Sequence, residues 1–539
     1  MKIMKKLFGS VITGSLLEGF IVRLQPSVAL QEIKTGKFVS IESDGNKFFS
    51  LITDLKLEVT NPDILVLPPS AHEHLLHNIL KKRDIYATAH IKPMVVLDRF
   101  NRVMPVKTIP SHFAPVHEVD SHDVALIFGD EKEPDKRFFN IGYPLDMDTP
   151  VCINLDKLVE RSNGIFGKTG TGKTFITRVV LAGLIHNEKA INLVFDMHSE
   201  YGLQARKEGN NESFVKGLKT LFPTKVAIFS LDPDSTRRRG GMPDVEIVIP
   251  YQAVHVEDVL SLQDELNLHS TALEAAYLVA AKYKRDWLEV LLSRGGDIKD
   301  FAQEIGAHPE SIAALYRKLK RIERLPFFKS NNQGEKQLHS MVDQMMEYID
   351  RGMHIIVEFG NYTSTFVYLL IANIITRRIH AEYVAKTEKF LGTHNKGDEP
   401  KKLLITIEEA HKFLNPIAAK QTIFGTIARE MRKYYVSLLV VDQRPSGIDP
   451  EVLSQLGTKI VAQLSDERDI QGVLNGINNG TMLRGVLASL DSKKQALVLG
   501  HAITMPVVIQ TREYDNEFYK AMAATMSFKT SQQLIDEIF

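Results

Sequence analysis

Residues 167–174 have the spacing Gly-x-x-x-x-Gly-Lys-Thr, which is typical of a loop that binds the phosphates of a nucleotide. The loop consists of Gly167, Lys168, Thr169, Gly170, Thr171, Gly172, Lys173 and Thr174. Its glycines allow backbone N–H groups to turn toward a polyphosphate, and a helix that begins at Lys173 adds the positive end of its dipole. Lys173 would contact the β- and γ-phosphates, and the Thr174 hydroxyl would bind Mg²⁺. The apolar run before the loop and the helical pattern after it argue against a chance glycine-rich turn, so we expect ATP and Mg²⁺ as cofactors.

A second chemical pattern is a pair of carboxylates, Glu408 and Glu409, that directly follows the apolar run 403–407. In a nucleotide hydrolase, a rigid strand end can place one acid in the Mg²⁺ shell and a second acid beside the attacking water. We therefore predict that Glu408 supports the metal and that Glu409 acts as the catalytic base. Because Glu408 is one methylene longer than the usual Asp, its direct contact with the metal stays open. Two solvated loop acids are the alternative interpretation.

The apolar run 436–441 ends in Asp442 and Gln443, and an amide at such a strand end could sense the γ-phosphate or orient water. Between this run and the acidic pair, a helical stretch carries Arg429 and Arg432. A guanidinium stabilises the charge that spreads over a transferring phosphoryl group, and one from a neighbouring subunit makes hydrolysis depend on assembly. Ordinary helix-surface arginines explain the same residues equally well, so both interpretations remain open.

The pattern of apolar runs predicts the elements that hold these residues. Residues 151–250 and 346–512 alternate strand-like and helical runs, and several strand-like runs are continuously apolar, which predicts an α/β domain with a mainly parallel sheet. Residues 1–110 show short alternating segments between turn residues, as in a small β-barrel or sandwich. Residues 111–150 contain several prolines and a charged run and are predicted to be a linker, whereas residues 513–539 are predicted to form a helix.

Residues 251–345 are helical in pattern throughout, which predicts an all-α insertion within the sheet domain. Within it, Ala302, Gly306, Pro309 and Ile312 have the spacing of a helix-turn-helix. The same spacing is common in ordinary helix pairs, so we favour the ordinary pair over a DNA-reading element.

The composition limits the classes of function. Among 539 residues, Lys plus Arg and Asp plus Glu are equal at 66 each, so a nucleic-acid surface would have to be local. The single cysteine, Cys152, excludes an internal disulfide framework and fits a reducing compartment. Residues 1–17 lack a cleavage pattern and no apolar run is long enough to span a bilayer, so we expect a cytoplasmic protein. His72, His74 and His77 have no carboxylate or cysteine partners at ligand-like spacing, which favours surface histidines over a metal site.

The chain resembles the HerA family of hexameric DNA-translocating ATPases, in the FtsK–HerA branch of the RecA-like P-loop proteins. The matching segments besides the phosphate loop are Val194–Gly202, Ile407–His411, Ala428–Tyr434 and Gln443–Ser446. The resemblance covers almost the whole chain and implies a RecA-like P-loop ATPase core with a helical insertion and a small N-terminal β-barrel. It also implies roles for site residues, namely Glu408 as Walker B acid, Glu409 as base, Gln443 as sensor, and Arg432, or less surely Arg429, as a finger acting in trans. The departures are Glu408 in place of the common Asp, and Asp442 where a small residue usually precedes the glutamine.

For function, the resemblance implies an ATP-driven double-stranded DNA translocase that forms a homo-hexameric ring. Its expected partner is a NurA-like nuclease or a defence-system effector, in DNA end processing or antiphage defence. The alternatives are an ATP-binding scaffold ring that organises an effector, and a conjugation- or secretion-coupling ATPase. Arg237, Arg238 and Arg239 precede two glycines in a connection between predicted strands, so they could contact DNA from a ring channel. A solvated arginine cluster on the outer surface is the favoured alternative.

Overall fold

The computed structural model describes residues 6–66, 79–80, 84–145, 147–207, 210–260, 262–294, 297–330, 341–430, 433–477, 480–491 and 494–524. His72, His74 and His77, and also Arg432, lie outside these described residues. The chain forms two compact units. Unit 1 consists of Met1–Leu158, Ile165–Ile176 and Gly457–Glu513, and unit 2 consists of Val159–Gly164, Thr177–Leu456 and Tyr514–Phe539.

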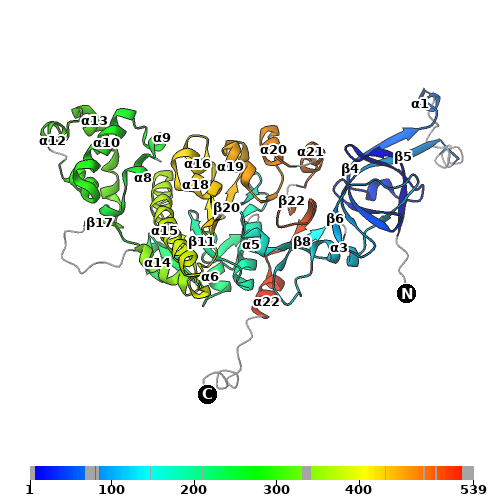
Figure 1. Cartoon of the computed structure of the whole chain (residues 1–539), viewed down its shortest axis with the longest axis horizontal. Helices are drawn as coiled ribbons and strands as arrows, with labels where there is room; N and C mark the ends of the chain where they lie inside the picture. Colours follow the sequence, from blue (N-terminus) through cyan, green and yellow to red (C-terminus); the bar gives the residue numbers. More distant parts are fainter. Residues whose placement is uncertain are drawn as a thin grey trace, which may run out of the picture. The chain divides into compact units, whose positions relative to one another are not determined.

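Unit 1 begins with the predicted β-barrel, the blue strands of Figure 1. Its strands are β1 (Leu7–Ser15), β2 (Gly19–Leu24), β3 (Phe38–Ser43), β4 (Asn46–Val59), β5 (Ile85–Leu97), β6 (Val103–Pro105) and β7 (Pro115–Glu118). The order β2-β1-β7-β3-β4-β5 closes because β2 also pairs with β5, and β6 extends the sheet from β5. Inward-facing side chains such as Phe8, Phe20, Ile41 and Phe48 form a common core, which explains the alternating apolar pattern of these strands.

Residues 111–150 are not the predicted linker. They contain β7, helix α3 (Ser121–Phe128) and strand β8 (Phe138–Pro144), which pairs with β9 (Val151–Asn154). Two of the prolines misled the prediction, because Pro115 begins β7 and Pro144 ends β8, where a missing N–H is tolerated. Helix α3 starts with a reciprocal capping box between Asp120 and Asp123. The segment is therefore an integral part of unit 1.

The rest of unit 1 contains antiparallel strands and the strand that leads into the phosphate loop. Strands β21 (Thr458–Val461), β22 (Gln495–Gly500) and β23 (Val507–Thr511) pair in sequence, and β23 pairs with β8. Strand β10 (Asn163–Phe166) leads into the loop, and the Phe166 carbonyl accepts from the Ala462 amide at 2.8 Å. This unit therefore supplies the strand that ends at the phosphate loop.

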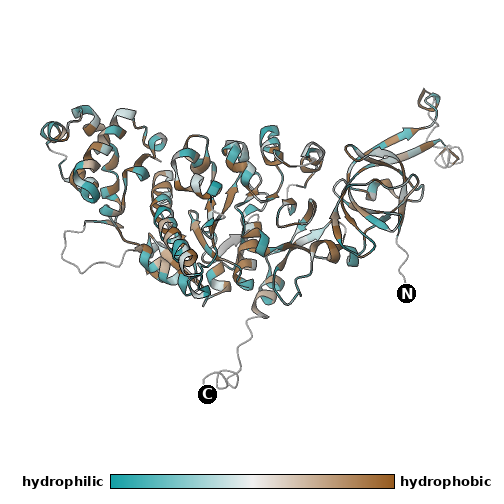
Figure 2. Ribbon diagram, viewed as in Figure 1, coloured by the Kyte–Doolittle hydropathy of each residue, from teal (hydrophilic) through white to brown (hydrophobic). Residues whose placement is uncertain are grey.

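Unit 2 contains a parallel sheet in the order β15-β14-β18-β11-β19-β20. These strands are β15 (Val245–Glu246), β14 (Val226–Ser230), β18 (His354–Glu358), β11 (Ile191–Asp196), β19 (Leu403–Glu408) and β20 (Val436–Asp442). The five longer strands are buried at every residue and largely brown in Figure 2, as expected for strands covered on both faces. The predicted α/β core is confirmed. All five end in a polar residue at the same edge of the sheet, so polar side chains are concentrated at this edge.

The longest helix of unit 2, α15 (Thr365–Thr393), shows how burial changes along one element. All residues from Phe366 to Thr376 are buried, whereas later only one face is, at Ile379, Tyr383 and Thr387. Ser364 caps the start through a hydrogen bond from the Val367 amide. The helix thus begins within the core and ends at the surface. No described helix is long and apolar enough to cross a membrane.

The predicted helical insertion forms the green group of helices in Figure 1, but residues 251–345 are not all-α, because they also contain the short strand β17 (Phe328–Lys329). Its helices are α8 (Val256–Leu260), α9 (Gln263–Leu266), α10 (Ser270–Tyr283), α11 (Trp287–Ser293), α12 (Ile298–Ile305) and α13 (Pro309–Leu319). Gly306 ends α12 in the left-handed conformation, with φ of 75°, and Pro309 is the first residue of α13. The helix pair therefore exists as the spacing predicts, while DNA reading by it stays a prediction.

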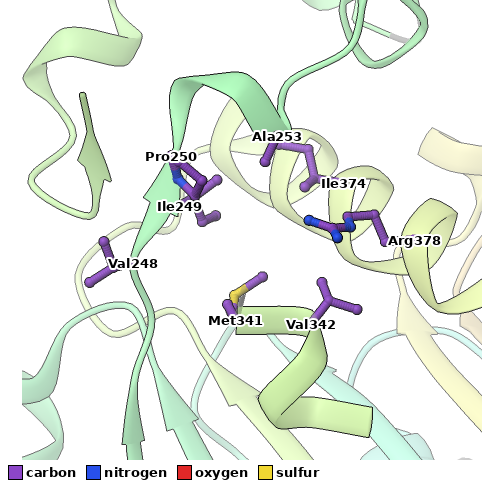
Figure 3. Close-up of a pocket in the computed structure, with 8 residues that line it drawn as sticks. All are labelled: Val248, Ile249, Pro250, Ala253, Met341, Val342, Ile374 and Arg378. Carbon is purple, nitrogen blue, oxygen red and sulfur yellow. The ribbon is translucent and has the colours of Figure 1, made fainter. Parts of the chain in front are cut away.

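Contacts with α14 (Met341–Asp350) and α15 hold the insertion on the core of unit 2. Arg377 on α15 donates to both carboxylate oxygens of Asp258 on α8, at 3.1 and 2.8 Å. Where strand β16 (Ile249–Pro250) meets α14 and α15, apolar side chains line a small pocket into which Arg378 also projects (Figure 3). This pocket contains no carboxylate or nucleophile, so it supports docking of the insertion rather than catalysis.

Candidate nucleotide-hydrolysis site

The phosphate loop of unit 1 has the backbone that its glycines predict. Gly170 and Gly172 have φ of 80° and 89°, and a Cβ at either position would meet no heavy atom within 4 Å. Helix α5 (Lys173–Asn187) begins at the predicted residue. Lys173 Nζ and Thr171 Oγ1 both donate to the Lys168 carbonyl, at 3.0 and 2.7 Å. The open space beside the glycines and the helix N-terminus fit a bound polyphosphate.

Unit 2 gathers acidic residues at the carboxyl edge of its parallel sheet. Asp196, Glu358, Glu408 and Asp442 are the last residues of β11, β18, β19 and β20, and each is buried. Asp196 is the register partner of Glu358, so two buried carboxylates lie side by side. Burial, with Glu358 as the next cause, raises the pKa of Asp196 to about 6. Within the described chain, no group of three or more His, Cys, Asp or Glu side chains is arranged to hold a metal by itself.

Glu408 is held firmly but keeps one oxygen without a partner. Its Oε1 accepts a hydrogen bond from the Tyr201 hydroxyl at 2.8 Å. The Tyr368 hydroxyl accepts from the Glu408 amide at 3.0 Å and donates to its carbonyl at 3.2 Å. Oε2 is buried and has no hydrogen-bond partner among the described residues. Burial and then Asp196 raise the pKa of Glu408 to about 8, so a cation that reaches Oε2 would satisfy an otherwise unpaired acid. The residue thus fits the predicted role in a Mg²⁺ shell.

Glu409 lies next to Gln443, the amide that the sequence predicts as a γ-phosphate sensor or a group that orients water. Gln443 Nε2 donates to Glu409 Oε1 at 3.2 Å. The backbone of Glu409 is left-handed, with φ of 49°, a conformation that is uncommon for a non-glycine residue. About a quarter of the side chain is exposed, at 28%. A partly exposed carboxylate that is oriented by an amide can act as a general base on water.

Asp442 explains how the turn after Glu409 is fixed. Its Oδ2 accepts from the His411 amide at 2.6 Å and contacts His411 Nδ1 at 2.9 Å, and its Oδ1 accepts from the Arg444 amide at 2.6 Å. The hydrogen bond from His411 to Asp442 raises the pKa of this histidine. The departure from a small residue at 442 therefore has a structural reason, since this carboxylate links β20 to the segment that carries the base.

A family model of the helicase HerA central domain matches residues 139–379. These residues are therefore similar to the central domain of the helicase HerA. The DNA double-strand break repair helicases HerA of Sulfurisphaera tokodaii and Sulfolobus acidocaldarius are 23% and 24% identical to it, over 90% of this chain and 90% of each relative. The probable DNA double-strand break repair helicase HerA of Methanocaldococcus jannaschii is 35% identical over 121 residues, 22% of this chain and 24% of the relative. The predicted resemblance to HerA proteins and the predicted enzyme class, an ATP hydrolase, are confirmed.

Two of the solved structures that are similar to this chain are those of VirB4 and of the plasmid coupling protein TrwB. VirB4 of Thermoanaerobacter pseudethanolicus has a TM-score of 0.44 and 14% identity, over 71% of this chain and 98% of VirB4. The plasmid coupling protein TrwB in complex with ADP and Mg²⁺ has a TM-score of 0.42 and 11% identity, over 68% of this chain and 88% of TrwB.

Of the two candidate arginine fingers, the structure describes Arg429 but not Arg432. Arg429 lies on α18 (Ile423–Glu430), and its guanidinium donates to the Ala419 carbonyl at 2.9 Å. It lines a cavity of about 230 Å³ together with Arg161, Ser162 and other residues. Arg432 lies outside the described residues, so its role as a finger stays a prediction.

The arginine cluster 237–239 is not the free loop that the sequence predicts. Asp232 and Pro233 start a short helix, α7 (Pro233–Arg238), because Asp232 accepts from the Ser235 amide and Pro233 fits the first helical position. Arg237 pairs with Asp234 at 3.1 Å and also with Glu246. Arg239 pairs with the fully buried Glu358 at 2.5 Å. Within the described chain, the exposed Arg238 alone of the three makes no salt bridge.

This arrangement predicts different effects for two neighbouring arginines. Arg239→Ala should lower the free energy of unfolding by about 3 kcal/mol, because it leaves the buried Glu358 without its cation. Arg238→Ala, the matched control on the exposed side, should change it by less than about 0.5 kcal/mol. Urea unfolding of both variants measures the difference. Equal effects would contradict the structural role of Arg239.

Several contacts of the site could not be found from sequence motifs alone. The hydroxyls of Tyr201 and Tyr368 form hydrogen bonds with Glu408, which is far away in the sequence. Glu358 lies beside Asp196 because strands β18 and β11 pair. The signal that could have found Glu358 and Asp196 is a polar residue at the end of an apolar strand.

Proposed function

We propose that this chain is an ATP-driven double-stranded DNA translocase that works as a homo-hexameric ring with a nuclease or another effector. The observation that carries the proposal is the Gln443–Glu409 contact at the carboxyl edge of a parallel sheet, in a chain that also has a complete phosphate loop. Such a pair is suited to orient a water molecule for attack on a phosphoryl group. The named activity of the HerA relatives, DNA double-strand break repair by a helicase, supports DNA as the substrate.

In the proposed mechanism, the phosphate loop binds ATP through its amides and Lys173, and Thr174 and Glu408 hold Mg²⁺. The metal, when bound, neutralises phosphate charge. Glu409 accepts the proton of the attacking water while Gln443 keeps its carboxylate in place. The hydrogen bond from the His411 amide to Asp442 holds the segment after Glu409 and thereby helps to keep Glu409 in its left-handed conformation.

The test is the ATPase rate of the full chain with and without double-stranded DNA, alongside its mass in solution. We expect DNA to raise the rate several-fold and the mass to correspond to a ring. The DNA effect should weaken as salt increases, because phosphate contacts release counterions. A rate that ignores DNA at every salt concentration, in a chain that still binds ATP as a ring, would favour the scaffold alternative.

Arg238→Ala is the surface variant for the same assay. If the exposed Arg238 contacts a DNA phosphate, its loss should weaken DNA binding and flatten the dependence of affinity on salt. The DNA-independent ATPase rate should not change. An unchanged salt dependence would place the DNA path elsewhere and leave the translocase proposal intact.

A separate prediction concerns Arg432, which we propose as a finger that completes the site of the neighbouring subunit. Arg432→Ala subunits and Glu409→Gln subunits should each be inactive alone. Mixed rings should recover part of the ATPase activity, because one kind of junction then combines an intact base with an intact finger. Steady-state phosphate release across mixing ratios measures this recovery. No recovery in rings that are shown to mix would contradict a trans role.

A further inference from the structure

The segment Asp196–Gly202 belongs to the motif that resembles HerA proteins, but the resemblance assigns it no role. In the structure it is a loop at the carboxyl end of β11 that the Asp196 side chain closes. Asp196 Oδ1 accepts from the Glu200 amide at 2.8 Å, and its Oδ2 accepts from the amides of Tyr201 and Gly202 at 2.8 and 3.1 Å. Arg178 on α5 holds the loop from a second side, with its Nε donating to the Glu200 carbonyl at 3.0 Å. The backbone around Tyr201 is therefore fixed from two elements.

Gly202 lets this loop lie close to the strand ends. A Cβ at this position would lie 2.5 Å from Glu358 Oε1 and 3.0 Å from Ile228 Cδ1, so a larger residue would push the loop away. The requirement is for space, since Gly202 does not adopt a left-handed conformation. The close packing at Gly202 therefore fixes the position of the loop against the sheet, and this position determines where the Tyr201 side chain lies.

Tyr201 is completely buried, and its hydroxyl ends on Glu408 Oε1. A glutamate has one more rotatable bond than the aspartate usual at this position, and the Tyr201 hydrogen bond restricts that bond. Tyr368 restrains the Glu408 backbone at the same time. Together the two tyrosines fix every polar atom of Glu408 except Oε2, which has no hydrogen-bond partner in the part of the chain that the structure describes.

We propose that Tyr201 is a positioning residue, which fixes Glu408 so that Oε2 is the oxygen offered to the Mg²⁺ shell. The inference rests on the proposed function, because it takes Glu408 as the acid that supports the metal. It gives the Asp196–Gly202 motif a role in metal binding, and it explains how a glutamate serves where an aspartate is usual. Partners that orient a ligand of a metal commonly change metal affinity by tenfold or more when they are lost.

The test measures binding of a fluorescent ADP to the full chain in EDTA and in excess Mg²⁺, without turnover. The dissociation constant in EDTA divided by that in Mg²⁺ reports how much Mg²⁺ strengthens nucleotide binding. Tyr201→Phe should lower this ratio by about tenfold and leave the constant in EDTA unchanged. The matched control is Tyr383→Phe, which removes another buried hydroxyl in unit 2, bonded to the Lys401 carbonyl at 3.0 Å. It should change neither constant.

A second background separates the inference from the proposed function. Glu408→Gln should itself lower the ratio, and Tyr201→Phe should then add no further loss, because Tyr201 acts through the Glu408 carboxylate. A normal ratio in Tyr201→Phe, or an equal further loss in the Glu408→Gln background, overturns the inference alone. A normal ratio in Glu408→Gln overturns both the inference and the assignment of Glu408.

Glu408→Asp tests the inference without altering the loop or its tyrosine. The shorter side chain withdraws the carboxylate from the Tyr201 hydroxyl, so we expect weaker support by Mg²⁺ although Asp is the common residue in related proteins. Equal or stronger support by Mg²⁺ in this variant overturns the inference. This arm also remains decisive if Tyr201→Phe does not fold.

Discussion

Replacing Glu409 by Gln is expected to leave ATP binding unchanged and to lower kcat by about a thousand-fold. A glutamine has nearly the same volume and can still contact Gln443, but it cannot accept the proton of the attacking water. The left-handed backbone at Glu409 is held by hydrogen bonds of Asp442 to the next turn, so the substitution should not release it. Fluorescent nucleotide binding and single-turnover phosphate release measure the two properties separately.

The control for this prediction is Lys173→Ala, which removes the cation of the phosphate loop and should abolish binding as well as turnover. The two variants thus distinguish loss of the catalytic base from loss of phosphate binding. Gln443→Ala should fall between them, with normal binding and a smaller loss of kcat, because the base remains but is less well oriented. Normal turnover in Glu409→Gln would remove this residue from the role of base.

The parts of the site that sequence patterns predicted are those encoded within a few residues. The phosphate loop depends on glycines at fixed spacing and on the helix start at Lys173, and both are present. The α/β class followed from continuously apolar runs, because only strands covered on both faces tolerate them. Glu409 and Gln443 were each predicted as site residues from their positions at strand ends, and their 3.2 Å contact follows from the pairing of the neighbouring strands β19 and β20.

The parts that were missed depend on strand order, which no local pattern contains. Glu358 and Arg239 are 119 residues apart, yet they pair because β18 lies next to β14 in the sheet. From sequence, Arg239 was one of three similar arginines, and only the buried partner distinguishes it from Arg238. The linker prediction for 111–150 failed for a related reason, since prolines at strand ends resemble prolines in loops until the pairing of β8 is known.

The buried acids at the carboxyl edge of the sheet also lower the stability of the nucleotide-free protein when they are ionised. Asp196 and Glu408 both have a raised pKa, and burial is the largest cause for each. Among the described residues, Arg239 forms a salt bridge with Glu358, whereas neither Asp196 nor Glu408 forms one. The arrangement is therefore poised for a positively charged ligand, and stability in the absence of that ligand should depend on pH.

Glu408→Gln should make the nucleotide-free protein more stable relative to the wild type as pH increases from 5 to 8. Folding raises the pKa of Glu408 from 4.5 to about 8, so the folded protein keeps a proton that the unfolded chain releases. Stability from this group is complete below pH 4.5 and is lost as pH rises toward 8. Glutamine does not titrate, so the difference in the free energy of unfolding should shift by roughly 3 kcal/mol over this range.

Urea unfolding at pH 5 and pH 8, in EDTA and without nucleotide, measures this shift. The matched control is Glu382→Gln on the exposed side of α15, which should differ from the wild type by less than about 0.5 kcal/mol at both pH values. A constant difference between Glu408→Gln and the wild type would show that Glu408 is already ionised in the folded protein at pH 5. In that case the buried acid would not need a cation to offset its burial, and the unpaired Oε2 would lose its significance as a metal ligand. A difference that grows with pH would instead support the view that ionising the buried Glu408 destabilises the protein without Mg²⁺, and that Mg²⁺ offsets this when the nucleotide binds.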